Sequence, residues 1–365
     1  MDFGFNEEQE IFRKSVKDFM KKEFSLEKVK EYEDIFDKEI DSGNKGYPEE
    51  LYKKMADLGW LGLSFPEKHG GIDCPFAYLV ILFEEMGRVL LPSPYLSTVV
   101  LSGETILRFG DDNHKERFLP DIISGDVILT MFKGMNGEFS GDRFIINGKE
   151  VFVPFADSSD YFIIVAKVGN NTSIFIVDSK TNGVKISPLR TMGGERICEV
   201  VLDNVSVSKD SMLIELRDDT ELLKIFDKAG IVKCAEMIGS AQSALEMAVQ
   251  YSRERIQFDK PIGSFQAISH RLAEMATRIE GGRLLIYKTA WMIENNIPCE
   301  KEIAITKTFV SEAHTYATVE GEQIMGGYGY MKEYNMQLFY RRAKEKELNI
   351  GDPDQNREII ASIII

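Results

Sequence analysis

Hydrophobic residues recur every three or four positions over the first third of the chain. They form two runs, which are separated at 64–71 by the segment SFPEKHGG, where proline and glycine interrupt the pattern. This spacing puts apolar side chains on one face of a helix, so it predicts helices within residues 1–125. The positions that carry the pattern are Leu51, Met55, Leu58 and Leu61, then Leu79, Leu82, Met86 and Leu90.

The pattern changes near residue 126 to short runs rich in valine and isoleucine. Each run is bounded by glycine, asparagine, aspartate or proline, as is typical of strands in a sheet. The dipeptide Asn147-Gly148 between two such runs predicts a tight hairpin turn. Residues 126–215 are therefore predicted to form a block of antiparallel strands. The clearest runs are 161–168, 173–178, 184–189 and 198–207.

Helical periodicity returns near residue 216 and persists to the end of the sequence. The segments 222–256 and 265–294 are each long enough for a helix of about 30 residues. The sequence thus predicts an α+β fold with an N-terminal helical domain (1–125), a middle antiparallel β-domain (126–215) and a C-terminal helical bundle (216–365). Strands and helices do not alternate and no GxGxxG motif is present, which argues against a doubly wound nucleotide-binding fold.

Composition and charge narrow the class of partner. The chain has 365 residues, of which 44% are hydrophobic, and a formal net charge of −15. Such an acidic chain repels phosphate backbones and anionic lipid, so we expect neither nucleic-acid binding nor membrane insertion. The sequence shows no signal-peptide pattern and no apolar run of the ~20 residues that would span a bilayer, so a cytoplasmic protein is expected.

Other polar features are expected to be structural. The four cysteines form no CxxC pair and lie near no histidine at metal-ligand spacing, so free thiols and no metal site are expected. The run YRRAKEKE at 340–347 is interpreted as a helix face that lies in solvent or at a subunit contact.

Four further segments occur in an order that resembles the acyl-CoA dehydrogenase family. They are LGWLGLSFPEKHGG (58–71), MGGERICEVVLDNVSV (192–207), YSRERIQFDKPIGSFQAISHRLAEM (251–275) and EQIMGGYGYMKEYNMQLFYRRAK (322–344). The resemblance implies an FAD enzyme that removes hydrogens from Cα and Cβ of an acyl-CoA thioester. It also implies an electron-transfer flavoprotein or similar acceptor, and a homo-oligomer or a hetero-oligomer with a related subunit.

The resemblance assigns FAD contacts to residues in the last two segments. A guanidinium suits the cofactor pyrophosphate, although an arginine at this place could equally form a surface salt bridge. Paired glycines often only end a helix, but in the family the backbone here lies close to FAD. The residues assigned are Arg255, Phe258, Gln266, Gln323, Gly326 and Gly327.

The same resemblance exposes a missing catalytic base. The family's usual glutamate position is Ile350 here, and the alternative position on an earlier helix is Ala229. Glu236 lies two turns beyond Ala229 and is a weak substitute, with a salt-bridged or partly exposed glutamate as the other interpretation. Asp227 matches a contact near the adenosine end of CoA, but the arginine that often accompanies it is Gly230 here.

The flavin-facing part of the β-domain also departs from the family. Relatives carry Trp-Ile-Thr after the hairpin lysine, where this chain has Val151, Phe152 and Val153. Phe152 or Phe155 is the candidate to meet the flavin rings. Two hypotheses follow: an acyl-CoA dehydrogenase with a non-standard or missing base, or a non-catalytic subunit that completes the FAD site of a partner in a heteromeric dehydrogenase.

Overall fold

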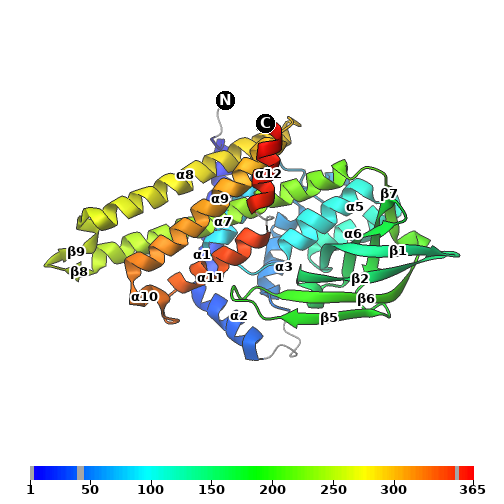
Figure 1. Ribbon diagram of the computed structural model, residues 1–365, viewed down its shortest axis with the longest axis horizontal. Helices are drawn as coiled ribbons and strands as arrows, with labels where there is room; N and C mark the ends of the chain where they lie inside the picture. The colour runs from blue at the N-terminus through cyan, green and yellow to red at the C-terminus, as the bar shows by residue number, and fades with distance from the viewer. Residues whose placement is uncertain (1–3, 39–44, 350–352) are drawn as a thin grey trace. The chain divides into compact units, whose positions relative to one another are not determined.

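The computed structural model describes residues 4–38, 45–349 and 353–365. By its internal contacts the chain divides into two compact units. The helical unit comprises the described residues of 1–29, 75–91 and 230–365, and the sheet unit comprises those of 30–74 and 92–229. The expected order of helices, sheet and helices along the chain is confirmed (Figure 1). The domain boundaries at 125 and 215 stay a prediction, since the N-terminal helices are shared between the two units.

Long helices dominate the helical unit, and α8 and α9 lie side by side (Figure 1). Both long C-terminal helices expected from the sequence are present as α7 and α8. The elements are α1 (Glu7–Glu23), α4 (Phe76–Arg88), α7 (Thr220–Glu254, from Gly230 onward), β8 (Ile256–Gln257), β9 (Lys260–Pro261), η6 (Ile262–Ser264), α8 (Gln266–Glu294), α9 (Glu300–Met325), α10 (Gly327–Tyr330), α11 (Met336–Asn349) and α12 (Pro353–Ile364).

Two glycines let helices α4 and α7 approach at backbone distance. A Cβ on Gly87 would overlap the carbonyl of Glu236, and a Cβ on Gly239 would overlap the carbonyl of Glu84. The two helices therefore cross where neither carries a side chain toward the other.

Replacing Gly239 by alanine is expected to lower the free energy of unfolding by about 1–3 kcal/mol, because the added methyl group must push two backbones apart. Urea unfolding measures the change. Gly281→Ala on α8 is the matched control, since its Cβ would meet only the movable ring of Phe309 at 3.2 Å. Equal stability of both variants and the parent would contradict the close crossing.

A buried charge network also ties helices together inside this unit. The Glu84 carboxylate is buried on α4 and forms ion pairs with Arg13 of α1 at 3.1 Å and with Arg283 of α8 at 2.9 Å. It also accepts a hydrogen bond from the Tyr287 hydroxyl at 2.7 Å. A buried carboxylate is tolerated only when it is paired with a cation and hydrogen-bonded. Here three donors from two helices, α1 and α8, contact the single carboxylate of Glu84. The network fixes the register of α1 and α8 against α4.

The sheet unit contains a seven-stranded sheet in the order β5-β6-β2-β1-β3-β4-β7. All neighbouring strands are antiparallel except β1 and β3, which are parallel. The strands are β1 (Leu129–Ser140), β2 (Arg143–Pro154), β3 (Tyr161–Val168), β4 (Asn171–Asp178), β5 (Val184–Leu189), β6 (Ile197–Ser208) and β7 (Met212–Leu216). One sheet face is filled by aromatic and β-branched residues, among them Phe132, Phe162 and Phe175.

The prediction of a hairpin turn at Asn147-Gly148 is wrong. Both residues lie inside β2, and the β1–β2 turn is at Gly141 and Asp142 instead. The register of β2 against β6 shifts here, because the single residue Asn147 of β2 lies opposite two residues of β6 (203–204), so the bulge is on β6. Glycine is needed at 148 because a Cβ there would lie 2.6 Å from Met135 Sδ.

Short helices complete the sheet unit. They are α2 (Leu26–Lys38, from Lys30), α3 (Glu49–Asp57), η1 (Trp60–Gly62), η2 (Glu67–His69), the π-helical turn η3 (Leu96–Gly103), α5 (Glu104–Phe109), α6 (Asp112–Ser124), η4 (Ala156–Ser158) and η5 (Lys209–Ser211). The run predicted as one helix through Leu61 is broken after Asp57, because Gly59 adopts a φ of +77°.

Candidate functional site

The tip of the helical unit begins where α7 ends. The chain there makes the two-stranded β8–β9 hairpin, whose turn residues Phe258 and Asp259 have φ values of 52° and 61°. Positive φ at both turn positions is the geometry of a two-residue hairpin. The turn leaves the ring of Phe258 86% exposed, and Arg255 just before the hairpin and Gln266 just after it are exposed too.

The end of α9 supplies the second group of predicted cofactor residues. Gln323 lies on its last turn, and Gly326 ends the helix with φ 57° and ψ −138°, a conformation essentially restricted to glycine. Nothing lies within 4 Å of a Cβ built on Gly326 or Gly327. The rings of Tyr251, one turn before Arg255, and Tyr328, next to Gly327, have centroids 6.3 Å apart. The structure thus brings both predicted groups to one end of the helical unit.

These residues fit an anionic dinucleotide. The guanidinium of Arg255 and the side-chain amides of Gln266 and Gln323 are exposed donors, and the open backbone at Gly326 and Gly327 allows a ligand to approach closely. The same tip exposes the aromatic rings of Phe258 and Tyr330, the latter 80% exposed. An exposed apolar tip of this kind suggests a surface that something covers.

A buried ionic cluster lies on α7 and α11 of the same unit. The Glu236 carboxylate contacts Lys233 Nζ at 2.9 Å and also pairs with Lys346 Nζ of α11. All three side chains are buried, so the interpretation of 340–347 as a solvated helix face is wrong at Lys346 and also at Arg342. Arg342 donates instead to the Leu90 carbonyl at 2.7 Å. The two nearby ammonium groups stabilise the carboxylate anion of Glu236. This stabilisation makes the carboxylate a weaker base.

His314 of α9 is fully buried next to this cluster. Its Nε2 lies 2.9 Å from Ser240 Oγ, and no described residue hydrogen-bonds to its Nδ1. Burial, together with the positive charges of Lys346 and Lys233, lowers the pKa of His314 to about 3. The imidazole is therefore neutral in the folded protein at neutral pH, whereas in the unfolded chain it gains a proton below about pH 6.5.

Acid is consequently expected to destabilise the fold through His314. The folded pKa lies below the unfolded one, so this contribution is complete above about pH 6.5 and falls by up to about 1.4 kcal/mol per pH unit between there and pH 3. Urea unfolding at about pH 7.5 and about pH 5 measures it. His314→Gln should lose this part of the pH dependence, while His270→Gln, at an exposed position, should keep it; identical slopes for all three proteins would refute the assignment.

Comparison with known proteins identifies the chain. The acyl-CoA dehydrogenase N-terminal domain matches residues 6–126, and the acyl-CoA dehydrogenase C-terminal domain matches residues 222–365. The chain belongs to the acyl-CoA dehydrogenase family. This is a family of flavin oxidoreductases that bind FAD and act on the CH–CH bond of acyl thioesters.

Relatives in this family include both dehydrogenases and reductases. The chain is 32% identical to a 3-(aryl)acrylate reductase of Clostridium sporogenes over 99% of each chain, and 31% identical to the caffeyl-CoA reductase-Etf complex subunit CarC of Acetobacterium woodii, also over 99% of each. It is similar in fold to the butyryl-CoA dehydrogenase of Megasphaera elsdenii, with a TM-score of 0.87, 27% identity and full coverage of both chains.

Both positions that the resemblance predicts for a catalytic base carry apolar residues, Ala229 and Ile350. Ala229 is buried on α7, and Ile350 lies outside the described residues. Asp227 is half-buried, and its contact with CoA stays a prediction. Gly230, which stands where relatives often have an arginine, leaves space for the side chain of Lys307 from α9. A Cβ on residue 230 would overlap that side chain. Sequence reasoning missed Lys307, since only the fold brings α9 against this turn of α7.

The two candidate flavin-facing phenylalanines differ in accessibility. Phe155 is buried and its ring packs edge-on against Tyr47 at 6.1 Å. Phe152 is 66% exposed and has a φ of 65° at the bulge between Glu150 and Val153. A bulky residue held in the left-handed region is strained. Phe152 is therefore the one of the two that is accessible to a ligand.

Neither a membrane-spanning helix nor a metal-binding cluster is found among residues 4–38, 45–349 and 353–365. No helix in this part of the chain is both long and apolar enough to cross a membrane. No group of three or more His, Cys, Asp or Glu side chains within it is arranged to hold a metal ion.

Proposed function

We propose that this chain is an FAD-dependent oxidoreductase that acts on the Cα–Cβ bond of an acyl-CoA thioester with a non-standard proton donor or acceptor. The observation that carries the proposal is the exposed set at the tip of the helical unit, with Arg255, two amides and two unobstructed glycines. Bound FAD would exchange a hydride with the β-carbon of the substrate. The guanidinium of Arg255 would hold the cofactor pyrophosphate.

The tip also supports an oligomer with cofactor between subunits. Arg255, Phe258 and the glycine loop all face solvent in a single copy, so one chain supplies only part of the surface that a large dinucleotide needs. A second copy or a related chain would complete it. Electron-transfer flavoprotein is the acceptor that fits best, because the name of the Acetobacterium relative places that protein in a complex with Etf.

The missing base favours a second candidate, a non-catalytic partner subunit. Ala229 cannot take or give a proton, and Glu236 is held by Lys233 and Lys346. A chain with this arrangement could bind the cofactor of a related subunit while that subunit carries the acid–base group.

The flavin spectrum of the purified full chain separates the two candidates. About one FAD per chain, with turnover of an acyl-CoA panel with an oxidising dye or of an enoyl-CoA panel with reduced viologen, supports the enzyme. A colourless chain that acquires flavin only with a co-encoded homologue supports the partner subunit. If the chain shows neither flavin nor turnover, alone or together with the homologue, both the enzyme and the partner-subunit candidates are contradicted.

Lys307 is expected to replace the missing arginine in holding CoA. Because its side chain passes over Gly230, Lys307→Met should weaken CoA binding by about tenfold while leaving the affinity for pantetheine, which lacks the adenosine phosphates, unchanged. Titration calorimetry measures both ligands. Lys301→Met on the same helix is the control, and equal CoA affinity of the two variants would remove Lys307 from the site.

A further inference from the structure

The dipeptide Asn-Gly occurs three times in the sequence, at 136–137, 147–148 and 182–183. In such a pair the backbone nitrogen of glycine can attack the side-chain carbonyl carbon of asparagine, because glycine has no Cβ to hinder the approach. The reaction needs an asparagine side chain that is able to fold back onto the backbone and a glycine N–H that no acceptor holds. The fold decides which of the three pairs meets both conditions.

Strand pairing holds two of the three pairs. Asn136 of β1 pairs with Asn147 of β2 on one side and with β3 on the other. Gly148 of β2 pairs with Leu202 of β6. The side chain of Asn147 is also occupied, since its Oδ1 accepts the Asn204 N–H at 2.6 Å. Residues in the interior of a sheet reach a reactive conformation only when the sheet opens locally, and such openings are rare.

The third pair lies in the turn between β4 and β5. The side chain of Asn182 is exposed, and a hydrogen bond from Val184 N to Thr181 O at 3.1 Å closes the turn. Glycine is required at the next position, because Gly183 has a φ of +95° and a Cβ on it would overlap the Asp203 carbonyl. In the described part of the chain, no hydrogen bond holds the Asn182 amide or the Gly183 N–H.

We propose that Asn182 is a site of spontaneous, non-enzymatic modification in the folded protein. Gly183 N forms a bond with Asn182 Cγ, and the bond between Cγ and Nδ2 breaks. The side-chain nitrogen leaves as ammonia, which takes up the proton that Gly183 N releases. One water molecule then opens the cyclic imide at either of its two carbonyl carbons, to give aspartate or isoaspartate. The steps consume only water and involve no change of oxidation state.

The position of the turn in the sheet explains why this pair reacts first. β5 is an edge strand that pairs with β6 alone, so the turn before it rearranges without opening the sheet interior. The other two pairs must separate strands on two sides before they react. We therefore expect the reaction at Asn182 to be at least about tenfold faster than at Asn136 or Asn147. This inference concerns the sheet unit alone and does not rest on the proposed enzymatic function.

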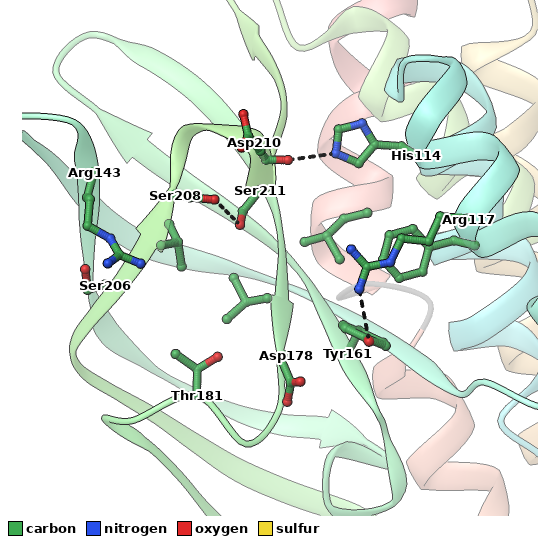
Figure 2. A pocket seen from close by; sticks show the side chains of 14 residues that line it. His114, Arg117, Arg143, Tyr161, Asp178, Thr181, Ser206, Ser208, Asp210 and Ser211 are labelled. Atoms are coloured by element: carbon green, nitrogen blue, oxygen red, sulfur yellow. Dashed lines mark hydrogen bonds between the residues drawn. The ribbon is translucent and has the colours of Figure 1, made fainter.

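The modification has a local structural consequence. It adds a negative charge next to Thr181, which Figure 2 shows at the rim of a cavity of about 510 Å³ in the sheet unit. Isoaspartate also adds a methylene group to the backbone, at a turn where the Gly183 carbonyl accepts the Asp203 N–H at 2.9 Å. The start of β5 is therefore expected to loosen in the isoaspartate form.

Peptide mass spectrometry of the full chain after incubation in mildly alkaline buffer tests the proposal. The three Asn-Gly pairs are compared within one sample, so Asn136 and Asn147 serve as internal controls. Aspartate and isoaspartate should accumulate at Asn182 at least about tenfold faster than at either control. Equal rates at the three positions, or a faster reaction at Asn136 or Asn147, would overturn the proposal.

The same comparison in the unfolded chain isolates the effect of the fold. In guanidinium chloride above the unfolding midpoint, the three pairs should react at similar rates, because strand pairing no longer protects two of them. If Asn182 kept its full advantage in the unfolded chain, the neighbouring sequence and not the turn would cause it, and the structural argument would fail.

Two variants link the modification to its charge. Asn182→Ser removes the reacting amide, and Asn136→Ser, at another exposed position, is the matched control. Ion-exchange chromatography should show an acidic species that grows with time in the parent and in Asn136→Ser but not in Asn182→Ser. Formation of the same species in Asn182→Ser would place the modification elsewhere. Amide hydrogen exchange of β5 should be faster in the acidic fraction, and unchanged exchange would contradict the expected loosening.

Discussion

Replacing Glu236 by glutamine is expected to lower the free energy of unfolding by about 3–5 kcal/mol. The substitution removes the negative charge of a carboxylate that contacts both Lys233 and Lys346, whose side chains are buried. Removing one partner of a buried ion pair is strongly destabilising, because the charge of the other partner stays desolvated. Urea unfolding at neutral pH measures the loss.

The control for this prediction lies on the same helix. Glu246 pairs with Arg88 at 2.7 Å, but its side chain is 52% exposed, so Glu246→Gln should cost less than about 1 kcal/mol. Glu236→Leu combined with Lys346→Leu should recover much of the stability, since it removes charge of both signs. If Glu236→Gln instead kept full stability and lost turnover, Glu236 would be the base and not a structural counter-ion.

The strands of the fold were predictable because their signal is local. Tyr161–Val168 is a run rich in valine and isoleucine that is bounded by turn residues, and in the structure it forms β3 with the same bounds. The Asn147-Gly148 turn failed for a non-local reason. An Asn-Gly pair suits a tight turn, but here Asn147 pairs with Asn136 of β1 and Gly148 pairs with Leu202 of β6, and these long-range pairings keep both residues inside a strand.

The site was predictable only in part. The resemblance located Arg255 and the glycine loop on the chain, but the pattern of residues could not say that both groups meet at one tip. The buried cluster was also hidden. Lys346 lies in a run of alternating charges that resembles a solvated helix, and only its approach to Glu236 across α7 and α11 buries it. The available signal was Lys233 and Glu236, spaced i and i+3 within an otherwise apolar segment.

Arg255→Gln is expected to weaken FAD binding by about ten- to a hundredfold. Glutamine keeps a hydrogen-bond donor but loses the charge and the planar fork that match a pyrophosphate. The flavin content after gel filtration, read from the visible spectrum, and the Kd from flavin fluorescence measure the effect. Because the side chain of Arg255 is exposed, the midpoint of urea unfolding without FAD should change little.

Arg253 provides a closely matched comparison, because it is an exposed arginine two residues earlier on the last turn of α7. Arg253→Gln makes the same change in net charge, so a loss of FAD caused only by long-range electrostatics would appear in both variants. A loss confined to Arg255→Gln would instead require direct contact at the hairpin. If Arg255→Gln retained as much flavin as the parent, the tip of the helical unit would not be the cofactor site. The exposed groups at Gln323 and Gly326 would then not contact FAD.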